Sequence, residues 1–461
     1  MRTSKTAAIS VSVVMTAMLG AALTVPAVAA DPEPTQEQRV SVEYFPEPGG
    51  EGKRTEVPVN TETVKSRSAA RSVAPTAETT DGQVGQLSVT GSSADRLDVV
   101  IVGDGYTADQ QDAFHTAAAA KWADITKIEP YASYKGLMNV WTVDAVSNES
   151  GISGDPSEDV VKDTALGSYF WCNYTERLVC ADIDKVAAYA AKAPEADLVV
   201  VLSNSTKYGG AGYSGLEEYG YPFDGVSTLS SDNSQSSMIA THEIAHSVGL
   251  LADEYTYDVY GTWPYGEATD INSSIYTAEQ MAANKTKWYR WLGEADPTGS
   301  TVGTYEGSSY YPYGIYRPTS NSIMRALNIT EFNLPGREAM IAGFYREANA
   351  LSSDVSTSNP VLRTSTITVS QAQLTGLAAP ELRWYVDGVQ VHKALNLTSV
   401  NPASLGVRPD GKAHTVTVKS VDRTASIRDP QALAEATESL TWTVKASGNK
   451  PNKGNSSNKG H

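Results

Sequence analysis

Two of the chain's six histidines, His242 and His246, stand four residues apart in the run THEIAHSVG at 241–249. The surrounding segment 234–250 has a helix-like pattern, and residues four apart share one helical face. Two imidazoles at this spacing can bind one Zn²⁺ at about 2.0–2.1 Å, with Glu243 beside the metal to polarise its water. The alternative is a solvated helix surface on which the pattern arises by chance. The motif therefore predicts a helix with metal-assisted chemistry on one face.

The residues after the motif supply candidates for a third metal ligand. Gly249 permits a positive φ, so we expect it to end the helix and to return the chain beneath the metal. A catalytic zinc ion commonly has three protein ligands and one water. Asp253 and Glu254 both follow the turn, and we assign the ligand to Asp253 because its short side chain restricts where the carboxylate can lie. Glu254 is then expected to support the site by accepting a hydrogen bond from a ligand imidazole.

The N-terminal residues predict export. Arg2 and Lys5 precede an apolar run at 7–23 that ends in small residues near Ala30. This pattern predicts a secretory signal peptide over 1–30 and an extracellular location; the alternative, a transmembrane anchor, is disfavoured by the small residues and the polar sequel. Residues 31–95 are rich in Pro, Glu, Thr, Ser and Gly, with one alternating stretch at 40–44. We interpret them as a leader or propeptide, with a small edge subdomain as the alternative.

The rest of the chain divides into two parts of different composition. Apolar runs at 97–103, 138–146 and 197–204 alternate with helix-like segments at 108–125 and 183–192, which predicts an α/β catalytic domain over 96–352. A glycine-rich run at 209–213 is expected to be a loop, and 226–230 a short edge strand. Residues 353–446 predict an all-β immunoglobulin-like sandwich with a hairpin at Asp387-Gly388. Residues 447–461 have a disordered composition.

Charge and cysteine content restrict the partners. Asp and Glu outnumber Lys and Arg by 53 to 36, so nonspecific electrostatic binding to nucleic acid or anionic lipid is not expected. After the signal, no run of about 18 apolar residues remains to span a membrane. Two cysteines exclude a Cys₄ zinc site, and in an oxidising compartment Cys172 and Cys180 are expected to form a local disulfide. The oligomeric state is not legible from the sequence.

The signature His242-Glu-x-x-His-x-x-Gly-x-x-x-Asp253-Glu-Tyr resembles that of the secreted zinc metallopeptidases typified by the bacterial IgA peptidase, relatives of the metzincins. The turn at 103–106 and the segments at 147–154, 305–307, 316–318 and 322–325 are also similar to the family's motifs, over roughly 95–345. The resemblance implies a twisted, mainly parallel sheet, an active-site helix and an antiparallel edge strand to which an extended substrate adds its backbone. It also implies that Met324 lies in a turn under the zinc without binding it.

These observations predict a secreted zinc endopeptidase that cleaves protein or peptide substrates, with one catalytic Zn²⁺ per chain and Glu243 as general base. The alternative is a secreted binding or adhesion protein in which the catalytic site is vestigial and no longer active. His115, His392 and His414 are interpreted as structural. One tyrosine of a cluster before Met324 is a candidate oxyanion donor, and spacing does not select among its members: Tyr305, Tyr310, Tyr311, Tyr313 and Tyr316.

Overall fold

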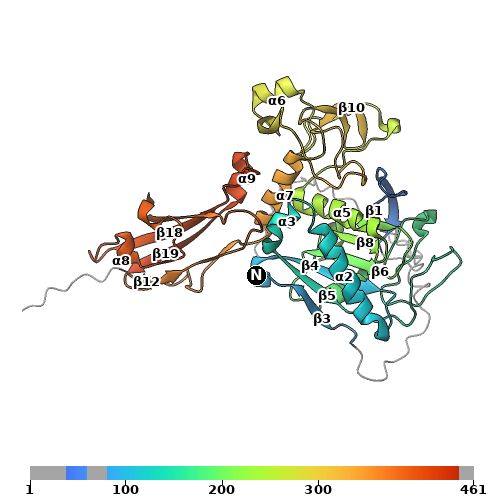
Figure 1. The fold of residues 1–461 in the computed structure, drawn as a ribbon, viewed down its shortest axis with the longest axis horizontal. Helices are drawn as coiled ribbons and strands as arrows, with labels where there is room; N and C mark the ends of the chain where they lie inside the picture. Colours follow the sequence, from blue (N-terminus) through green and yellow to red (C-terminus); the bar gives the residue numbers. More distant parts are fainter. Residues whose placement is uncertain (1–37, 60–79, 446–461) are drawn as a thin grey trace, which may run out of the picture. The chain divides into compact units, whose positions relative to one another are not determined.

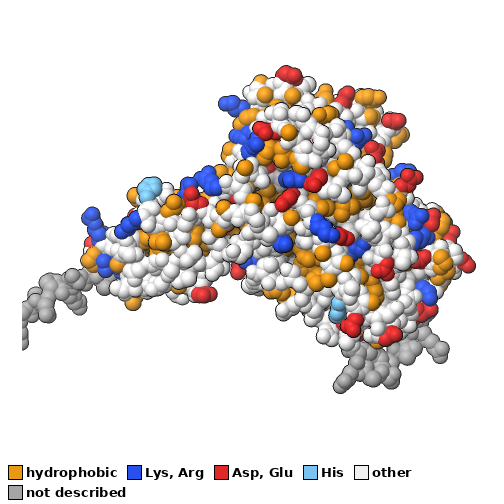
Figure 2. Space-filling view, in the orientation of Figure 1, with side chains coloured by type: hydrophobic (Ala, Val, Ile, Leu, Met, Phe, Trp, Pro, Cys, Tyr) orange, Lys and Arg blue, Asp and Glu red, His pale blue; other side chains and the backbone are white. Residues whose placement is uncertain are grey.

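The computed structural model describes residues 38–59 and 80–445 (Figure 1). The predicted signal peptide at 1–30 and the predicted tail at 447–461 lie outside these residues. Within the described part of the chain, no helix is both long enough and apolar enough to cross a membrane. On the face shown in Figure 2, acidic and basic side chains are interspersed.

The N-terminal part of the described chain is built on one eight-stranded sheet with the order β2-β1-β7-β8-β6-β4-β5-β3. Its strands are β1 (Arg39–Tyr44), β2 (Lys53–Pro58), β3 (Val84–Ser88), β4 (Leu97–Asp104), β5 (Met138–Val143), β6 (Leu198–Ser203), β7 (Gly210–Tyr213) and β8 (Val226–Ser230). The four strands β5, β4, β6 and β8 are parallel, whereas β1, β2, β3 and β7 pair antiparallel with their neighbours. The expected mainly parallel sheet is therefore a mixed sheet with a parallel centre.

Helices cover both faces of this sheet because its central strands are apolar on both sides. All eight residues of β4 are buried, which is typical of a strand between two helical layers. One core contains residues of β4 with α2 (Gln111–Ile125), α5 (Ser237–Gly249) and α7 (Leu334–Glu347). The opposite core contains α4 (Ile183–Ala190) and apolar side chains of the β1–β2 hairpin. The predicted α/β layering is confirmed.

Two segments of the sheet differ from the expectation. The glycine-rich run at 209–213 was expected to be a loop, but its last four residues form the buried strand β7. Residues 226–230 form β8, which lies between β6 and β7 and is not an edge strand. Glycine lowers strand propensity, but here it allows close packing: a Cβ atom at Gly210 would lie 2.4 Å from the Thr228 carbonyl oxygen.

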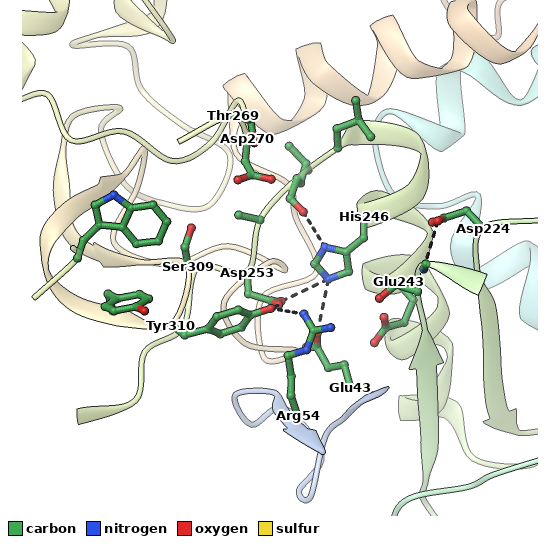
Figure 3. Close-up of a pocket in the computed structure, with 17 residues that line it drawn as sticks. Glu43, Arg54, Asp224, Glu243, His246, Asp253, Thr269, Asp270, Ser309 and Tyr310 are labelled. Carbon is green, nitrogen blue, oxygen red and sulfur yellow. Dashed lines mark hydrogen bonds and ion pairs between the residues drawn. The ribbon is translucent and has the colours of Figure 1, made fainter. Parts of the chain in front are cut away.

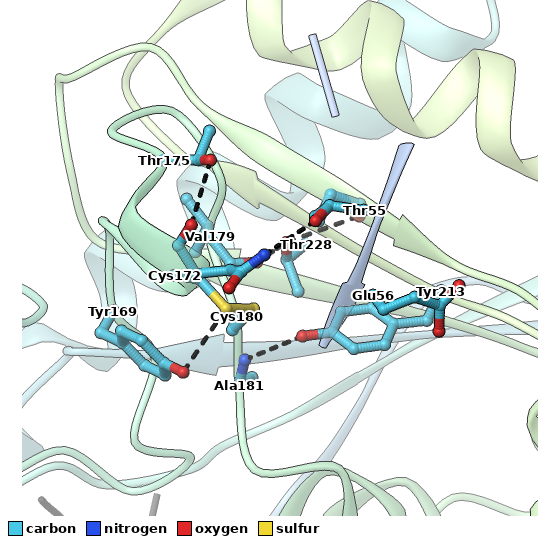
Figure 4. The surroundings of a disulfide bond; sticks show 12 residues. Thr55, Glu56, Tyr169, Cys172, Thr175, Val179, Cys180, Ala181, Tyr213 and Thr228 are labelled. Atoms are coloured by element: carbon cyan, nitrogen blue, oxygen red, sulfur yellow. Dashed lines mark hydrogen bonds between the residues drawn. A yellow bond between two sulfur atoms is a disulfide. The ribbon is translucent and has the colours of Figure 1, made fainter. Parts of the chain in front are cut away.

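A smaller lobe between α5 and α7 adds α6 (Ala278–Asn284) and the antiparallel pair β9 (Tyr305–Ser308) and β10 (Tyr311–Arg317). A single helical turn, α3 (Tyr131–Tyr134), precedes β5. Cys172 and Cys180 form the predicted disulfide, and both are buried (Figure 4). The bridge closes a short loop beside β2, where Asn173 donates a hydrogen bond to the Thr55 hydroxyl at 2.8 Å.

The C-terminal region is mostly β, and its immunoglobulin-like topology stays a prediction. Its main sheet has the order β12-β19-β18-β15-β16, and two further strand pairs, β11–β14 and β13–β17, lie beside it. The predicted turn at Asp387-Gly388 joins β15 to β16, with φ of 48° and 80°. Trp384 and Trp442 stack in its core. Its elements are β11 (Leu351–Ser352), β12 (Val361–Leu362), β13 (Ile367–Thr368), β14 (Ser370–Gln371), β15 (Glu381–Val386), β16 (Val389–Gln390), β17 (Ser399–Val400), α8 (Pro402–Leu405), β18 (Ala413–Val421), α9 (Pro430–Glu435) and β19 (Thr437–Lys445).

Candidate metal centre

The helix α5 places both motif histidines on one face, as their spacing predicts. The Nδ1 atom of His242 donates to the Ile323 carbonyl oxygen at 2.9 Å, and that of His246 donates to the Leu251 carbonyl oxygen at 2.6 Å. A proton on Nδ1 leaves the Nε2 lone pair of a neutral imidazole free to bind a metal. The two Nε2 atoms face each other 3.0 Å apart.

The end of α5 has a different cause from the expected one. The residue with positive φ is Leu250, at 50°, which follows the helix in the left-handed conformation. Gly249 is needed for space, because a Cβ atom there would lie 2.6 Å from the Met340 sulfur of α7. The expectation that Gly249 supplies the positive φ is therefore wrong, although the chain does turn back under the histidines at this point.

That return places Asp253 against both histidines. Its Oδ1 atom lies 3.1 Å from Nε2 of His242 and 3.3 Å from Nε2 of His246, and the residue is 1% exposed. Its Oδ2 atom accepts a hydrogen bond from the Tyr310 hydroxyl at 2.6 Å. The Asp253 main-chain carbonyl oxygen accepts a hydrogen bond from the Ser309 amide, so both the main chain and the carboxylate of Asp253 are held in place.

A fourth residue, Glu43, joins the cluster from a distant part of the chain (Figure 3). It lies on β1, and its side chain reaches the histidines: Oε1 is 3.2 Å from Nε2 of His242, and Oε2 is 3.5 Å from Nε2 of His246. One ligand atom from each of Glu43, His242, His246 and Asp253 lies within 4.8 Å of the others. No sequence motif pointed to Glu43.

The donor atoms of this cluster fit a divalent cation. With Nδ1 protonated, two Nε2 lone pairs and two carboxylates face one another, and such an arrangement is repulsive without a positive charge between them. Burial lowers the pKa of His242, but Glu43 and Asp253 outweigh it and raise the pKa to about 10, so this place favours a positive charge, which a bound cation would supply instead of the proton on Nε2. Ligands bound tetrahedrally at about 2.0–2.1 Å lie about 3.3 Å apart, close to the 3.0–3.5 Å separations here. The residues therefore fit zinc.

Glu243 lies beside the cluster and is not one of its donors. A Cβ atom at Gly212 of β7 would lie 1.7 Å from Glu243 Oε2, so the carboxylate packs directly over this glycine. Its Oε1 atom is buried and has no hydrogen-bond partner among the described residues. Burial and the nearby Glu43 carboxylate raise the pKa of Glu243 to about 8. The raised pKa makes this carboxylate a stronger base than an ordinary glutamate, and a cation bound beside it would favour its ionised form.

Glu254 and Met324 lie in the wall beneath the cluster. The Glu254 carboxylate does not take its hydrogen bonds from an imidazole, as we had expected; it accepts them from Asn272, Asn333 and Ser322 at 2.7–3.0 Å. The Glu254 amide donates to the Met324 carbonyl oxygen. Met324 is 1% exposed, and Ile323 before it orients His242. Glu254 thus fixes the turn that contains Met324, and this turn positions His242 through the Ile323 carbonyl oxygen.

Among the tyrosines left open by the sequence, Tyr310 is the one whose hydroxyl bonds to the cluster, through Asp253. It also accepts a hydrogen bond from Arg54 of β2, and the Arg54 guanidinium lies 5.5 Å from its ring centroid. Together with Glu43, Glu243 and His246, these residues line an open cavity of about 590 Å³. This cavity is large enough for several residues of an extended peptide.

The other three histidines of the described residues lie away from the cluster. His115 bonds to the buried Asp144 at 2.7 Å, and His414 bonds to Asp387 and Asp410 in the C-terminal region. His392 lies in a short helical turn of that region. The structural role assigned to all three stays a prediction.

A model of the IgA Peptidase M64 family matches residues 86–300 and 294–344 of this chain. The match contains both histidines, Glu243, Asp253 and Met324. It begins after the β1–β2 hairpin, so Glu43 and Arg54 lie outside it. A comparison with curated proteins finds no match.

Proposed function

Because the chain belongs to the IgA Peptidase M64 family and is therefore a metallopeptidase, we propose that it is a secreted zinc endopeptidase with Glu243 as its general base. The observation that carries the proposal is the convergence of two Nε2 lone pairs and the Asp253 carboxylate beside a non-ligand glutamate in an open cavity. The predicted signal peptide and the disulfide, which is typical of oxidising compartments, support secretion.

His242, His246 and Asp253 would hold the zinc ion, which supplies a Lewis acid for the scissile carbonyl and its attacking water. Glu243 accepts the proton of that water and passes it to the departing amine. Its position over Gly212 holds the carboxylate on the side of β7, next to the metal donors. The Tyr310 hydroxyl donates its proton to Asp253 in the described arrangement, and it could donate to a developing oxyanion only after releasing that hydrogen bond.

The test is casein hydrolysis by the purified chain and by a Glu43→Gln chain. The variant is included because the Glu43 carboxylate lies in the metal cluster, and a carboxamide in its place competes poorly with water or substrate for the metal. We expect hydrolysis that a chelator abolishes and added zinc restores. His246→Ala should abolish both zinc binding and hydrolysis, whereas His115→Ala, a matched change outside the cluster, should leave both unchanged. Absence of chelator-sensitive hydrolysis in every chain that retains zinc would contradict the proposal.

A further inference from the structure

The β1–β2 hairpin occupies the edge of the sheet at the active site. Its two strands pair over six residues, from Arg39 opposite Pro58 to Tyr44 opposite Lys53. Strand β1 then pairs antiparallel with β7, placing Glu43 opposite Gly212. On the outer edge of β7, Gly212 and Tyr213 are therefore already paired with this chain's own N-terminal segment.

That edge is where an extended peptide substrate would bind. Strand addition to an exposed sheet edge is a common mode of peptide recognition, because main-chain hydrogen bonds give affinity without regard to sequence. Gly212 lies under the general base Glu243, so a peptide paired with β7 would pass directly in front of the catalytic groups. Strand β1 takes this path itself.

Glu43 also fills the metal site. Its carboxylate is 3% exposed and lies within 3.5 Å of both Nε2 atoms. With His242, His246 and Asp253 it makes four protein ligands, and a zinc ion held by four protein ligands is closed, as in structural sites. A catalytic zinc site instead keeps one position for water or substrate.

The second strand of the hairpin engages the other wall of the cavity. Arg54 donates a hydrogen bond to the Tyr310 hydroxyl and lies over its ring. The same hydroxyl donates to Asp253. Tyr310 is therefore held between the hairpin and a metal donor, and its hydroxyl is not free to contact a substrate carbonyl.

Apolar side chains hold the hairpin in this position. Val40, Val42 and Phe45 are at most 1% exposed, and the Phe45 ring packs edge-on against the His242 imidazole with centroids 5.0 Å apart. The hairpin precedes the segment that matches the family model. The hairpin therefore lies outside the matched segment, and its side chains contact the metal-binding residues of that segment.

We propose that the β1–β2 hairpin is an intramolecular inhibitor, which binds along β7 in place of a peptide substrate and supplies Glu43 as the fourth metal ligand. The inference rests on the proposed function. It assigns the described arrangement to a latent form of the enzyme, and it requires that the hairpin leave β7 before a substrate can bind.

The test measures access to the metal without relying on catalysis. The chain is loaded with Co²⁺, and acetohydroxamate is titrated while the visible absorption of the cobalt is recorded. If the closed form outnumbers the open form by about ten to one, Glu43→Gln should bind acetohydroxamate about tenfold more tightly than wild type. The matched control is Glu51→Gln, because Glu51 follows β1 in the same hairpin but pairs with Arg325 at 3.2 Å, away from the metal donors.

Equal acetohydroxamate affinity in wild type and Glu43→Gln would overturn the inference. So would a Glu43→Gln chain that is folded by circular dichroism but cannot retain cobalt, because Glu43 would then be a permanent ligand. Casein hydrolysis should rise in parallel with access. An open metal site in Glu43→Gln without hydrolysis of casein or peptides would contradict the proposed function instead, so the two failures are distinguishable.

Discussion

Gly212→Ala tests whether the contact between β7 and Glu243 positions the general base. Gly212 has no positive φ, so alanine suits the backbone of the strand. Its Cβ atom, however, would lie 1.7 Å from Glu243 Oε2, whereas ordinary van der Waals contact begins at 3.4 Å. The carboxylate must therefore move by about 1.7 Å. A displacement of about 1 Å in a catalytic group can cost about 10²-fold in rate.

We expect Gly212→Ala to lower kcat/KM by at least about 10²-fold and to leave the zinc content unchanged, because Glu243 is not a metal donor. The assay is hydrolysis of a fluorogenic peptide in the Glu43→Gln background, so that the hairpin does not compete. Gly266→Ala is the control, since a Cβ atom there meets nothing within 4 Å. Activity within a few fold of the parent would refute the reasoning that this contact sets the position of the base.

Three further outcomes are expected. Asp253→Ala should weaken zinc binding well beyond the roughly 10–100-fold typical of losing a supporting residue, whereas Glu254→Gln should stay within that range. Zinc competition against a chromogenic chelator measures both affinities. A larger loss of zinc affinity in Glu254→Gln than in Asp253→Ala would exchange the two roles. Burial raises the pKa of Glu438 from 4.5 to about 7, so the stabilisation from its bound proton is complete below about pH 4.5 and is lost as the pH rises through about 7. The Tm of wild type should therefore fall relative to that of Glu438→Gln between pH 5 and 8. Parallel Tm profiles of the two proteins would contradict this. Truncation after about Ser353 should leave short-peptide turnover largely intact. It should lower Tm, because Asp422 in the removed region accepts hydrogen bonds from two buried tyrosines of the catalytic part. A truncated chain that keeps its zinc and is inactive on a short peptide would contradict the domain division.

Local patterns predicted the elements that carry the ligands. The spacing of His242 and His246 determined their shared helical face, and the apolar run at 97–103 predicted the central strand β4. The disulfide between Cys172 and Cys180 followed from their closeness in sequence and the predicted compartment. Each of these inferences depends on residues that are near one another along the chain.

Contacts between distant segments were not predictable in this way. Glu43 lies about two hundred positions before the histidines, and its alternating strand gave no reason to single out one glutamate. The glycines were misread for a related reason: Gly249 and Gly212 are required by the Met340 and Glu243 side chains packed against them. A sequence reveals that a glycine is present, but not which neighbour needs the space.

The most direct test of the central claim is the zinc content and peptide hydrolysis of Glu243→Gln, measured in the Glu43→Gln chain. The four metal donors do not include Glu243, so we predict close to one zinc per chain in both proteins. Loss of the general base should reduce hydrolysis by about 10²–10⁴-fold or more. A Glu243→Gln chain that retains zinc and hydrolyses the peptide at nearly the parent rate would contradict the claim that Glu243 is the base.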